Sequence, residues 1–234
     1  MGISLLSEWC TGFTGLIYPN LCVCCASGLL RDERYICGHC LYELPETGFY
    51  REDGNPVERM FWGRVKVEHA AALYFFRKGN RIQTLVHQIK YKGQMELGEC
   101  LGREMGKKLS STAFAEVDMV VPVPLHPSKL KKRGYNQSEW IARGVCSRLE
   151  KPLNTSALVR RMVADSQTRK KRYERWENVE SGFGLTSPHC FSGKHILLID
   201  DVVTTGATLE ACIRTVQYAG DVKVSIAALA FTTA

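Results

Sequence analysis

The chain has 234 residues, of which 45% are hydrophobic and 24% charged. These values are typical of a globular protein and exclude a chain too small or too polar to bury a core. The length fits one domain of ordinary size with a small appendage, and the sequence contains no internal repeat and no low-complexity tract.

The net charge of +7 is unevenly distributed along the chain. From His126 to Arg175 there are 14 Lys and Arg against 4 Asp and Glu, which gives +10, whereas the remainder has 17 against 20, which gives −3. All of the excess positive charge thus lies in about a fifth of the chain. This indicates an anionic partner for one face, with a merely solvated surface as the alternative.

The first 19 residues predict an amphipathic helix, because apolar residues recur there every three or four positions. The segment has no basic start, contains Glu8, and is too short and too polar to span a membrane. We expect this helix to pack on its own protein or on a partner. With no export signal, we expect a cytoplasmic protein, in which ten cysteines indicate metal binding rather than disulfides.

The next segments alternate between strand and helix patterns. An apolar run at 69–76 precedes helical periodicity at 82–91 and 97–109. Two short apolar runs, 119–123 and 195–199, have the character of buried strands, and a helical stretch follows each. A last apolar run covers 222–231. This alternation predicts an α/β domain built on a mostly parallel sheet.

Two Cys-x-x-Cys pairs near the start of the chain predict a zinc site. Eleven residues separate the pair Cys22 and Cys25 from the pair Cys37 and Cys40. Four thiolates leave a tetrahedral ion no position for water, so the predicted role is structural, and metal binding would supply folding free energy to a small lobe. Cys24 is an alternative ligand to Cys25, because the two residues are adjacent.

The segment from Ile196 to Cys212 predicts a pocket for a sugar phosphate. A buried strand ends in the acids Asp200 and Asp201 and is followed by a loop of small residues and then a helix. Such a strand brings its loop to the carboxyl edge of the sheet, where α/β proteins bind ligands. The loop amides and the helix dipole would bind a phosphate, and the two acids would accept hydrogen bonds from a sugar diol or hold magnesium through water.

This segment resembles the phosphoribosyl pyrophosphate (PRPP) motif of type I phosphoribosyltransferases. The resemblance implies a central parallel sheet flanked by helices, with the acids on the ribose hydroxyls and the threonine loop on the 5-phosphate. The predicted phosphoribosyl-binding residues are Asp200, Asp201, Val203, Thr204, Thr205, Gly206, Ala207 and Thr208.

Further motifs resemble the ComF family of competence proteins over nearly the whole chain. They include the cysteine pairs, residues 89–93, Val121–His126, Lys129–Ser138 and 167–179. The resemblance implies residues 1–60 as an N-terminal helix with a four-cysteine zinc finger, residues 61–234 as a phosphoribosyltransferase-like domain, and a role in DNA uptake. It does not define a reaction, and no catalytic residue is assigned.

The basic segment has two candidate ligands, the pyrophosphate of PRPP and a single-stranded nucleic acid. Its predicted contacts are Lys129, Lys131, Lys132, Arg133, Asn136, Gln137, Arg161, Gln167, Arg172 and Arg175. Lysines and arginines with interleaved aromatic residues suit backbone neutralisation and base stacking, and a solvated helix is the alternative for 169–175. Tyr91, Phe75 and Phe76 are expected in the core, and His126 is expected to be structural.

Two hypotheses for the function follow. In the first, the chain binds PRPP or a nucleotide with magnesium and transfers the phosphoribosyl group to an acceptor that the sequence does not identify. In the second, it is a non-enzymatic module that binds single-stranded DNA and docks on a competence helicase or a recombination protein. The same pocket can serve both, because the terminal nucleotide of a strand carries a 5-phosphate.

Overall fold

The computed structural model describes residues 20–161 and 182–232. The predicted first helix and the predicted contacts Gln167, Arg172 and Arg175 lie outside these residues. The helices are α2 (Gly38–Tyr42), α3 (Pro56–Arg59), α4 (Arg81–Tyr91), α5 (Met95–Leu109), α6 (Pro127–Arg133), α7 (Gln137–Leu149) and α8 (Ala207–Gln217), with short 3-10 turns at Phe49–Arg51, Ala113–Glu116 and Pro188–Cys190. None of the described helices is long and apolar enough to cross a lipid bilayer.

The central sheet has four strands in the order β1 (Ala70–Phe76), β6 (Lys223–Thr232), β5 (His195–Val203) and β2 (Met119–Pro122). All three pairings are parallel. Nearly every residue of these strands is buried, as expected when helices cover both faces of a parallel sheet. The predicted α/β fold is confirmed. A two-stranded antiparallel sheet of β3 (Leu158–Arg160) and β4 (Phe183–Leu185) adds to it.

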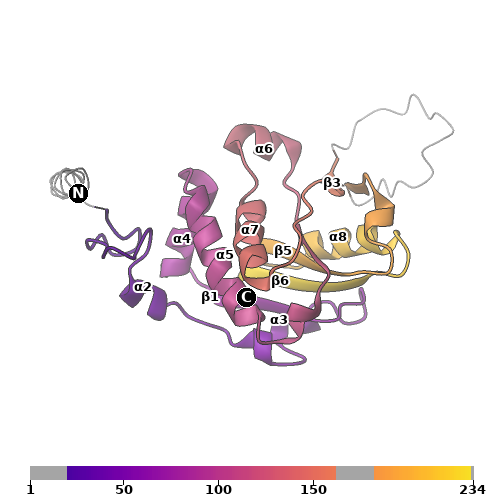
Figure 1. The fold of residues 1–234 in the computed structure, drawn as a ribbon, viewed down its shortest axis with the longest axis horizontal. Coiled ribbons are helices and arrows are strands. Elements are labelled where there is room, and N and C mark those ends of the chain that lie inside the picture. Colours follow the sequence, from indigo (N-terminus) through magenta and orange to yellow (C-terminus); the bar gives the residue numbers. More distant parts are fainter. Residues whose placement is uncertain (1–19, 162–181, 233–234) are drawn as a thin grey trace, which may run out of the picture.

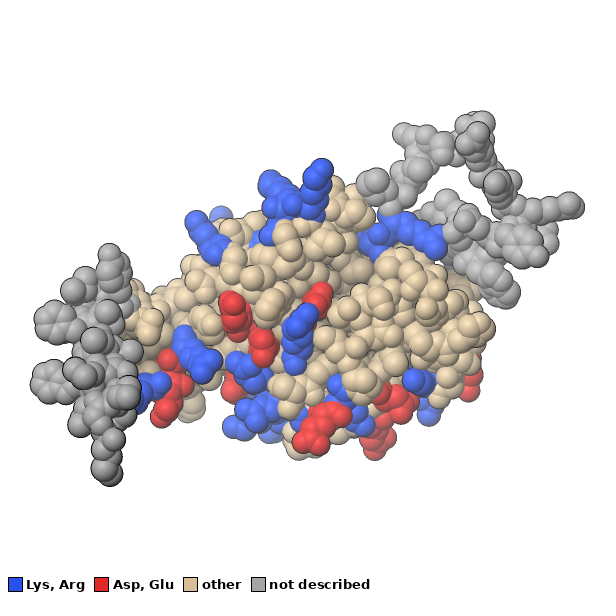
Figure 2. Space-filling view, turned by 45° about the horizontal axis from the view of Figure 1, so that its top comes forward, with Lys and Arg blue, Asp and Glu red and all other residues tan. Residues whose placement is uncertain are grey.

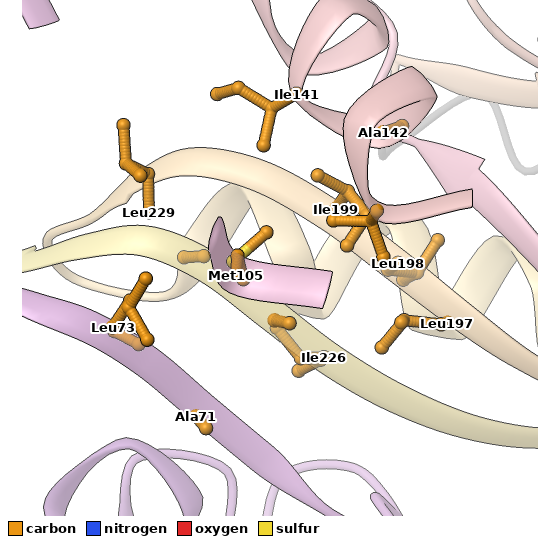
Figure 3. Close-up of a cluster of buried hydrophobic side chains, with 14 of the residues drawn as sticks. Ala71, Leu73, Met105, Ile141, Ala142, Leu197, Leu198, Ile199, Ile226 and Leu229 are labelled. Carbon is orange, nitrogen blue, oxygen red and sulfur yellow. The ribbon is translucent and has the colours of Figure 1, made fainter. Parts of the chain in front are cut away.

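Helices cover the two faces of the sheet unequally. In Figure 1, α4, α5 and α7 lie on one face and α8 on the other. Figure 3 shows Met105 of α5 and Ile141 of α7 in one apolar cluster with Ile199 and Leu229 of the central strands. For α4, α5 and α8 this follows from right-handed crossovers, because the chain moves from β1 to β2 in one direction across the sheet and from β5 to β6 in the other. Helix α7 shares the face of α4 and α5 because it leads from β2 outward to Leu153, which pairs in parallel with Val120.

Glycines allow α5 and α7 to approach each other closely. A Cβ at Gly102 would lie 2.1 Å from the carbonyl oxygen of Ile141, and a Cβ at Gly144 would lie 2.1 Å from that of Glu99. Any larger residue at either position would push the helices apart. This packing fixes α7, whose first turn reaches the carboxyl edge of the sheet.

The segment that precedes β1 joins the core of the sheet. The ring of Phe49 packs edge to face against Phe75 and Phe231, at centroid distances of 5.5 and 6.0 Å. The side-chain oxygen of Asn55 caps α3, while its amide nitrogen donates to the carbonyl oxygens of Phe49 and Ala70. A domain boundary at residue 60 stays a prediction, but residues on its amino-terminal side already pack on the sheet.

Candidate functional site: a cleft at the carboxyl edge of the sheet

The four parallel strands end around one cleft of about 530 Å³. Phe76 of β1, Val123 after β2, Asp200 of β5 and Thr232 of β6 all line it. Residues of α4, α6 and α7 complete the walls. The cleft therefore lies where open α/β sheets bind their ligands.

The two predicted acids meet in this cleft. The hydroxyl of Ser138, in the first turn of α7, donates to Asp200 Oδ1 over 3.1 Å. The ammonium of Lys90, in the last turn of α4, lies 3.0 Å from Asp201 Oδ1. Burial and the neighbouring charge of Asp201 raise the pKa of Asp200 to about 7. The negative charge of Asp201 is thus balanced by Lys90, whereas the raised pKa of Asp200 favours its neutral, protonated form.

The second carboxylate oxygen of Asp201 has no such compensation. Asp201 Oδ2 is fully buried and has no hydrogen-bond partner among the described residues. A buried acceptor without a partner is costly and uncommon in proteins. Because Asp201 lines the cleft, a ligand bound there can supply the missing donor.

The threonine loop forms a small hollow beside the acids. Asp200 and residues 202–209 line a space of about 40 Å³ at the start of α8. The backbone amides of Thr205, Gly206 and Thr208 donate to no acceptor within the described part of the chain. Thr204, Thr205 and Thr208 are exposed, whereas Val203 is buried, with its backbone in the hollow. Free amides at the start of an eleven-residue helix suit an anion such as a phosphate.

Gly206 shapes this loop and is supported from below. Its φ of +73° lies in the left-handed region, which other residues adopt at a cost. A Cβ at this position would meet the ring of Phe61 at 3.3 Å and Met60 at 3.5 Å. The segment after α3 is therefore the floor of the loop, a role that the sequence analysis did not assign.

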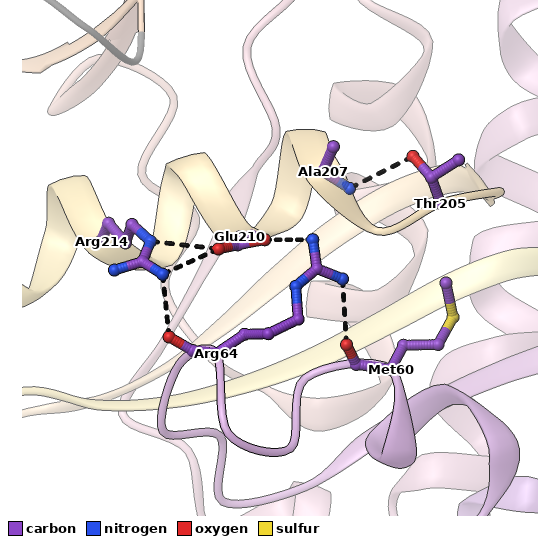
Figure 4. A network of polar contacts seen from close by, with 6 residues as sticks. All are labelled: Met60, Arg64, Thr205, Ala207, Glu210 and Arg214. Atoms are coloured by element: carbon purple, nitrogen blue, oxygen red, sulfur yellow. Dashed lines mark hydrogen bonds and ion pairs between the residues drawn. The ribbon is translucent and has the colours of Figure 1, made fainter.

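Ion pairs hold that floor against α8, as Figure 4 shows. Arg64 pairs with Glu210 of α8 and donates to the carbonyl oxygen of Met60 over 3.0 Å. Arg214 binds the same Glu210 at 2.8 Å and donates to the carbonyl oxygen of Arg64 at 2.9 Å. The two arginines lower the pKa of Glu210, so this carboxylate is ionised at neutral pH.

The described residues that were predicted as anion contacts fall into three groups. Lys129 and Arg133 of α6 and Gln137 of α7 line the cleft, and Arg133 donates to the side-chain oxygen of Gln137. Asn136 instead caps α7 through Ser138 N and donates to the carbonyl oxygen of Val123 over 3.0 Å. Lys131, Lys132 and Arg161 are exposed outside the cleft. Figure 2 shows the Lys and Arg side chains that gather on the top of the molecule, where α6 lies in Figure 1.

The four cysteines of the two Cys-x-x-Cys pairs converge. The sulfur atoms of Cys22, Cys25, Cys37 and Cys40 all lie within 4.8 Å of one another. The amide of Cys37 donates to Cys22 Sγ over 3.3 Å, and the amide of Cys40 donates to Cys37 Sγ over 3.4 Å. Cys24 is not part of the cluster, so the matched pairs are the set that can hold a metal ion.

Comparisons with known proteins agree with this geometry. Residues 132–233 match the phosphoribosyl transferase domain family. The chain is 27% identical to the DNA utilization protein YhgH of Escherichia coli K12, with 81% of each chain covered, and 25% identical to Competence protein F of Haemophilus influenzae, with 94% of each covered. It is also 30% identical to Competence protein ComFC of Bacillus subtilis, over 54% of this chain and 50% of that protein. The carboxyl-terminal half of the chain thus matches a phosphoribosyl transferase domain, and most of the chain is similar to proteins named for DNA utilization and competence.

One solved structure similar to this chain is the glutamine PRPP amidotransferase of B. subtilis in complex with ADP and GMP. It is 20% identical, its TM-score is 0.39, and the match covers 62% of this chain and 26% of that enzyme's chain. A second is an allosteric regulatory enzyme of purine biosynthesis, which is 18% identical with a TM-score of 0.43, over 61% of this chain and 30% of the other.

Several residues of the cleft lie outside the predicted set. Ser138 ends the motif Lys129–Ser138, but no pattern in the sequence indicates that its hydroxyl binds Asp200. Lys90 is not among the predicted contacts, and the structure pairs it with Asp201. Tyr91 was expected in the core and is 66% exposed, so that prediction is wrong. Phe76, also expected in the core, is partly buried at the cleft wall. His126 is structural as expected, because its ring accepts from Ser128 N at the start of α6.

Proposed function

We propose that the cleft binds a 5-phosphoribosyl group, as PRPP or as a 5′-nucleotide, together with magnesium, and that the protein acts in DNA uptake or processing. One observation carries the proposal. The unpartnered oxygen of Asp201 and the free amides of the threonine loop lie in adjoining hollows, where a ribose diol and its 5-phosphate would satisfy both. The names of the relatives, which refer to DNA utilization and competence, support the biological part.

Each part of the ligand has matching groups in this arrangement. Asp200 and Asp201 accept hydrogen bonds from the vicinal ribose hydroxyls. The amides and hydroxyls of Thr204–Thr208 donate to the phosphate at the positive end of the α8 dipole. Lys129 and Arg133, which line the same cleft from α6, attract the pyrophosphate of PRPP or a further phosphate.

Carboxylates suit magnesium, which favours oxygen ligands and usually keeps several waters and substrate phosphates. When bound, magnesium would neutralise the charge of the pyrophosphate group. Lys90 already holds one oxygen of Asp201, so the protein's own cation and magnesium would share this carboxylate.

The enzymatic form of the proposal is transfer of the phosphoribosyl group. A nucleophile forms a bond to the anomeric carbon, the bond from that carbon to the pyrophosphate oxygen breaks, and pyrophosphate leaves with the electron pair. The nucleophile then loses its proton to solvent or to a base. The protein contributes by orienting the donor and binding the departing pyrophosphate.

The alternative is a non-enzymatic module for single-stranded DNA. It is favoured by helix α6, which exposes Lys129, Lys131 and Lys132 and has no buried residue. In this form the strand lies along the basic surface, while the cysteine lobe, holding zinc, and the amphipathic helix predicted for residues 1–19 dock on a helicase or a recombination protein.

Calorimetric titration with PRPP, with and without magnesium, tests the pocket. We expect binding that Asp200→Asn and Asp201→Asn each weaken at least 10-fold, on the order of one lost charge-assisted hydrogen bond. Asp221→Asn is the matched control, because Asp221 is an exposed acid that precedes the amino end of β6, whereas the cleft lies at the carboxyl end of that strand. No binding of PRPP or of any 5′-nucleotide would overturn the proposal.

Two further measurements separate the enzyme from the module. Release of pyrophosphate with a panel of nucleobases and amines supports the enzyme, and its absence for every acceptor favours the module. For the module, affinity for single strands should fall steeply with salt, and reversing Lys131, Lys132 and Arg133 should reduce the slope by about one unit per lost phosphate contact.

A further inference from the structure

A second hollow of about 360 Å³, which we call the outer hollow, adjoins the cleft. It shares Lys90, Tyr91, Lys129 and Arg133 with the cleft, so the two spaces meet along these residues. A water molecule takes about 30 Å³, so the outer hollow has room for a phosphate group and part of the molecule that carries it. The two spaces can therefore hold two ligands side by side.

The outer hollow is strongly cationic. Four cations line it, Lys90 of α4 and Lys129, Lys132 and Arg133 of α6, and no acid among the described residues does. The ammonium of Lys90 is balanced by Asp201 at 3.0 Å. The side chains of Lys129 and Lys132 form no hydrogen bond or ion pair with any other described residue. Positive charge that lines a concave space attracts anions, so the unbalanced cations of α6 favour an anionic ligand here.

Helix α6 presents three of these cations on one face. Lys129, Lys132 and Arg133 have the spacing i, i+3 and i+4, which places side chains next to one another on a helix. Lys131 has a different direction and lines neither the cleft nor the outer hollow. The helix dipole favours cations in the last turn of α6 but not Lys129 in its first turn, so the dipole does not account for this set.

Contacts between α6 and α4 give the outer hollow its shape. The guanidinium of Arg133 lies 5.4 Å from the centre of the Tyr91 ring and donates to the side-chain oxygen of Gln137. The hydroxyl of Tyr135 donates to the carbonyl oxygen of Ile89, which ties the turn after α6 to the end of α4. The protein's own contacts therefore hold the cations of α6 beside the cleft.

Unbalanced cations that face a hollow next to the cleft suit a phosphate group. We propose that the outer hollow is a second phosphate site, which binds the phosphate of a second ligand beside the phosphoribosyl group in the cleft. Lys132 lines the outer hollow alone, whereas Lys129 and Arg133 border both spaces. In the enzymatic form of the function, the acceptor is then a phosphorylated molecule whose phosphate lies in the outer hollow while its nucleophile reaches the cleft. This inference rests on the proposed function, since it takes the cleft as the site of the phosphoribosyl group.

Equilibrium dialysis of the full chain with radiolabelled inorganic pyrophosphate, at fixed salt and magnesium, tests the second site. When PRPP saturates the cleft, we expect one pyrophosphate per chain to remain bound. Lys132→Met should weaken this binding roughly 10-fold, the size of one lost charge-assisted hydrogen bond, and should leave the affinity for PRPP unchanged. Lys131→Met removes the same charge from the same helix but outside both spaces, so it is the matched control and should keep both affinities.

The outcomes separate this inference from the proposed function. Complete displacement of pyrophosphate by PRPP, or a loss of PRPP affinity in Lys132→Met, would show that the outer hollow belongs to the PRPP site and would overturn the second site alone. Equal effects of Lys131→Met and Lys132→Met would overturn it too, because they would indicate diffuse surface charge. Failure of PRPP to bind would overturn the proposed function, and the phosphate site would then stand or fall on the same two variants with pyrophosphate alone.

Discussion

Replacing Gly206 by Ala should damage both the stability of the protein and its phosphate loop. Gly206 has a φ of +73°, and a left-handed backbone costs an alanine about 1–2 kcal/mol. The smaller entropy of alanine in the unfolded chain offsets about 0.4–1 kcal/mol of this. The new methyl group would also lie 3.3 Å from two ring atoms of Phe61, which is buried and has little room to move. Overpacking of this kind adds about 1–3 kcal/mol, so the expected total is about 1–5 kcal/mol.

Gly193→Ala is the matched control for this change. Gly193 has a φ of +69° in the turn before β5, but a Cβ there meets nothing within 4 Å, so the variant should lose only about 0.5–1 kcal/mol. Thermal unfolding should therefore show Gly206→Ala melting about 5–10 °C lower than the parent chain and Gly193→Ala only slightly lower. Affinity for PRPP should fall roughly 10-fold or more in Gly206→Ala alone, because the displaced amides lose a charge-assisted hydrogen bond. Equal stability losses in the two variants, with unchanged affinity, would refute the idea that Phe61 supports the loop.

Three other predictions concern charges and thiols. Lys90→Met leaves Asp201 buried without its cation and should lower the free energy of unfolding by about 1–3 kcal/mol, with magnesium restoring part of the loss in thermal unfolding. The pKa of Asp200 is about 7 in the folded protein and near 3.9 in the unfolded chain. Between these two values the unfolded chain has lost this proton and the folded protein has kept it. The free energy of unfolding should therefore fall as pH rises from 4 to 7, by at most about 1.4 kcal/mol per pH unit. Denaturant unfolding should show a flatter profile for Asp200→Asn, and an unchanged profile would count against the buried acid. Cys25→Ser should abolish the one zinc ion per chain expected from metal analysis, whereas Cys24→Ser should keep it, and equal metal contents would contradict the assigned ligand set.

The sequence predicted those parts of the molecule that depend on local pattern. The strand, acid pair and threonine loop from Ile196 to Thr208 form one continuous motif, so their order alone indicated an anion site at the edge of a sheet. The cysteine pairs are a similar case, since their spacing defines a set of four ligands. In both cases the residues of the predicted site are close neighbours in the chain.

The parts that could not be predicted depend on contacts between distant segments. Ser138 meets Asp200 across 62 positions of the chain, and Arg214 meets the carbonyl oxygen of Arg64 across 150. No periodicity encodes such pairs, because they arise only when the strands are ordered in the sheet. The wrong prediction for Tyr91 has a different cause. An aromatic residue in an amphipathic helix was expected on the buried face, but that face of α4 is formed by residues such as Ile82 and Ile89, and Tyr91 lies outside it.

The contacts of the segment before β1 bear on where the phosphoribosyl transferase unit begins. The matched family region starts at residue 132, yet the loop that would bind the phosphate rests on Met60 and Phe61. Phe49 fills the space between Phe75 and Phe231 on the central strands, so a chain cut at residue 60 would expose these rings. The ion pair between Arg64 and Glu210 also holds residues 60–64 against α8. A shift of residues 60–64 would therefore change the support of the threonine loop. The residues that join the cysteine lobe to the sheet therefore support the threonine loop and belong to the same packed unit as α8.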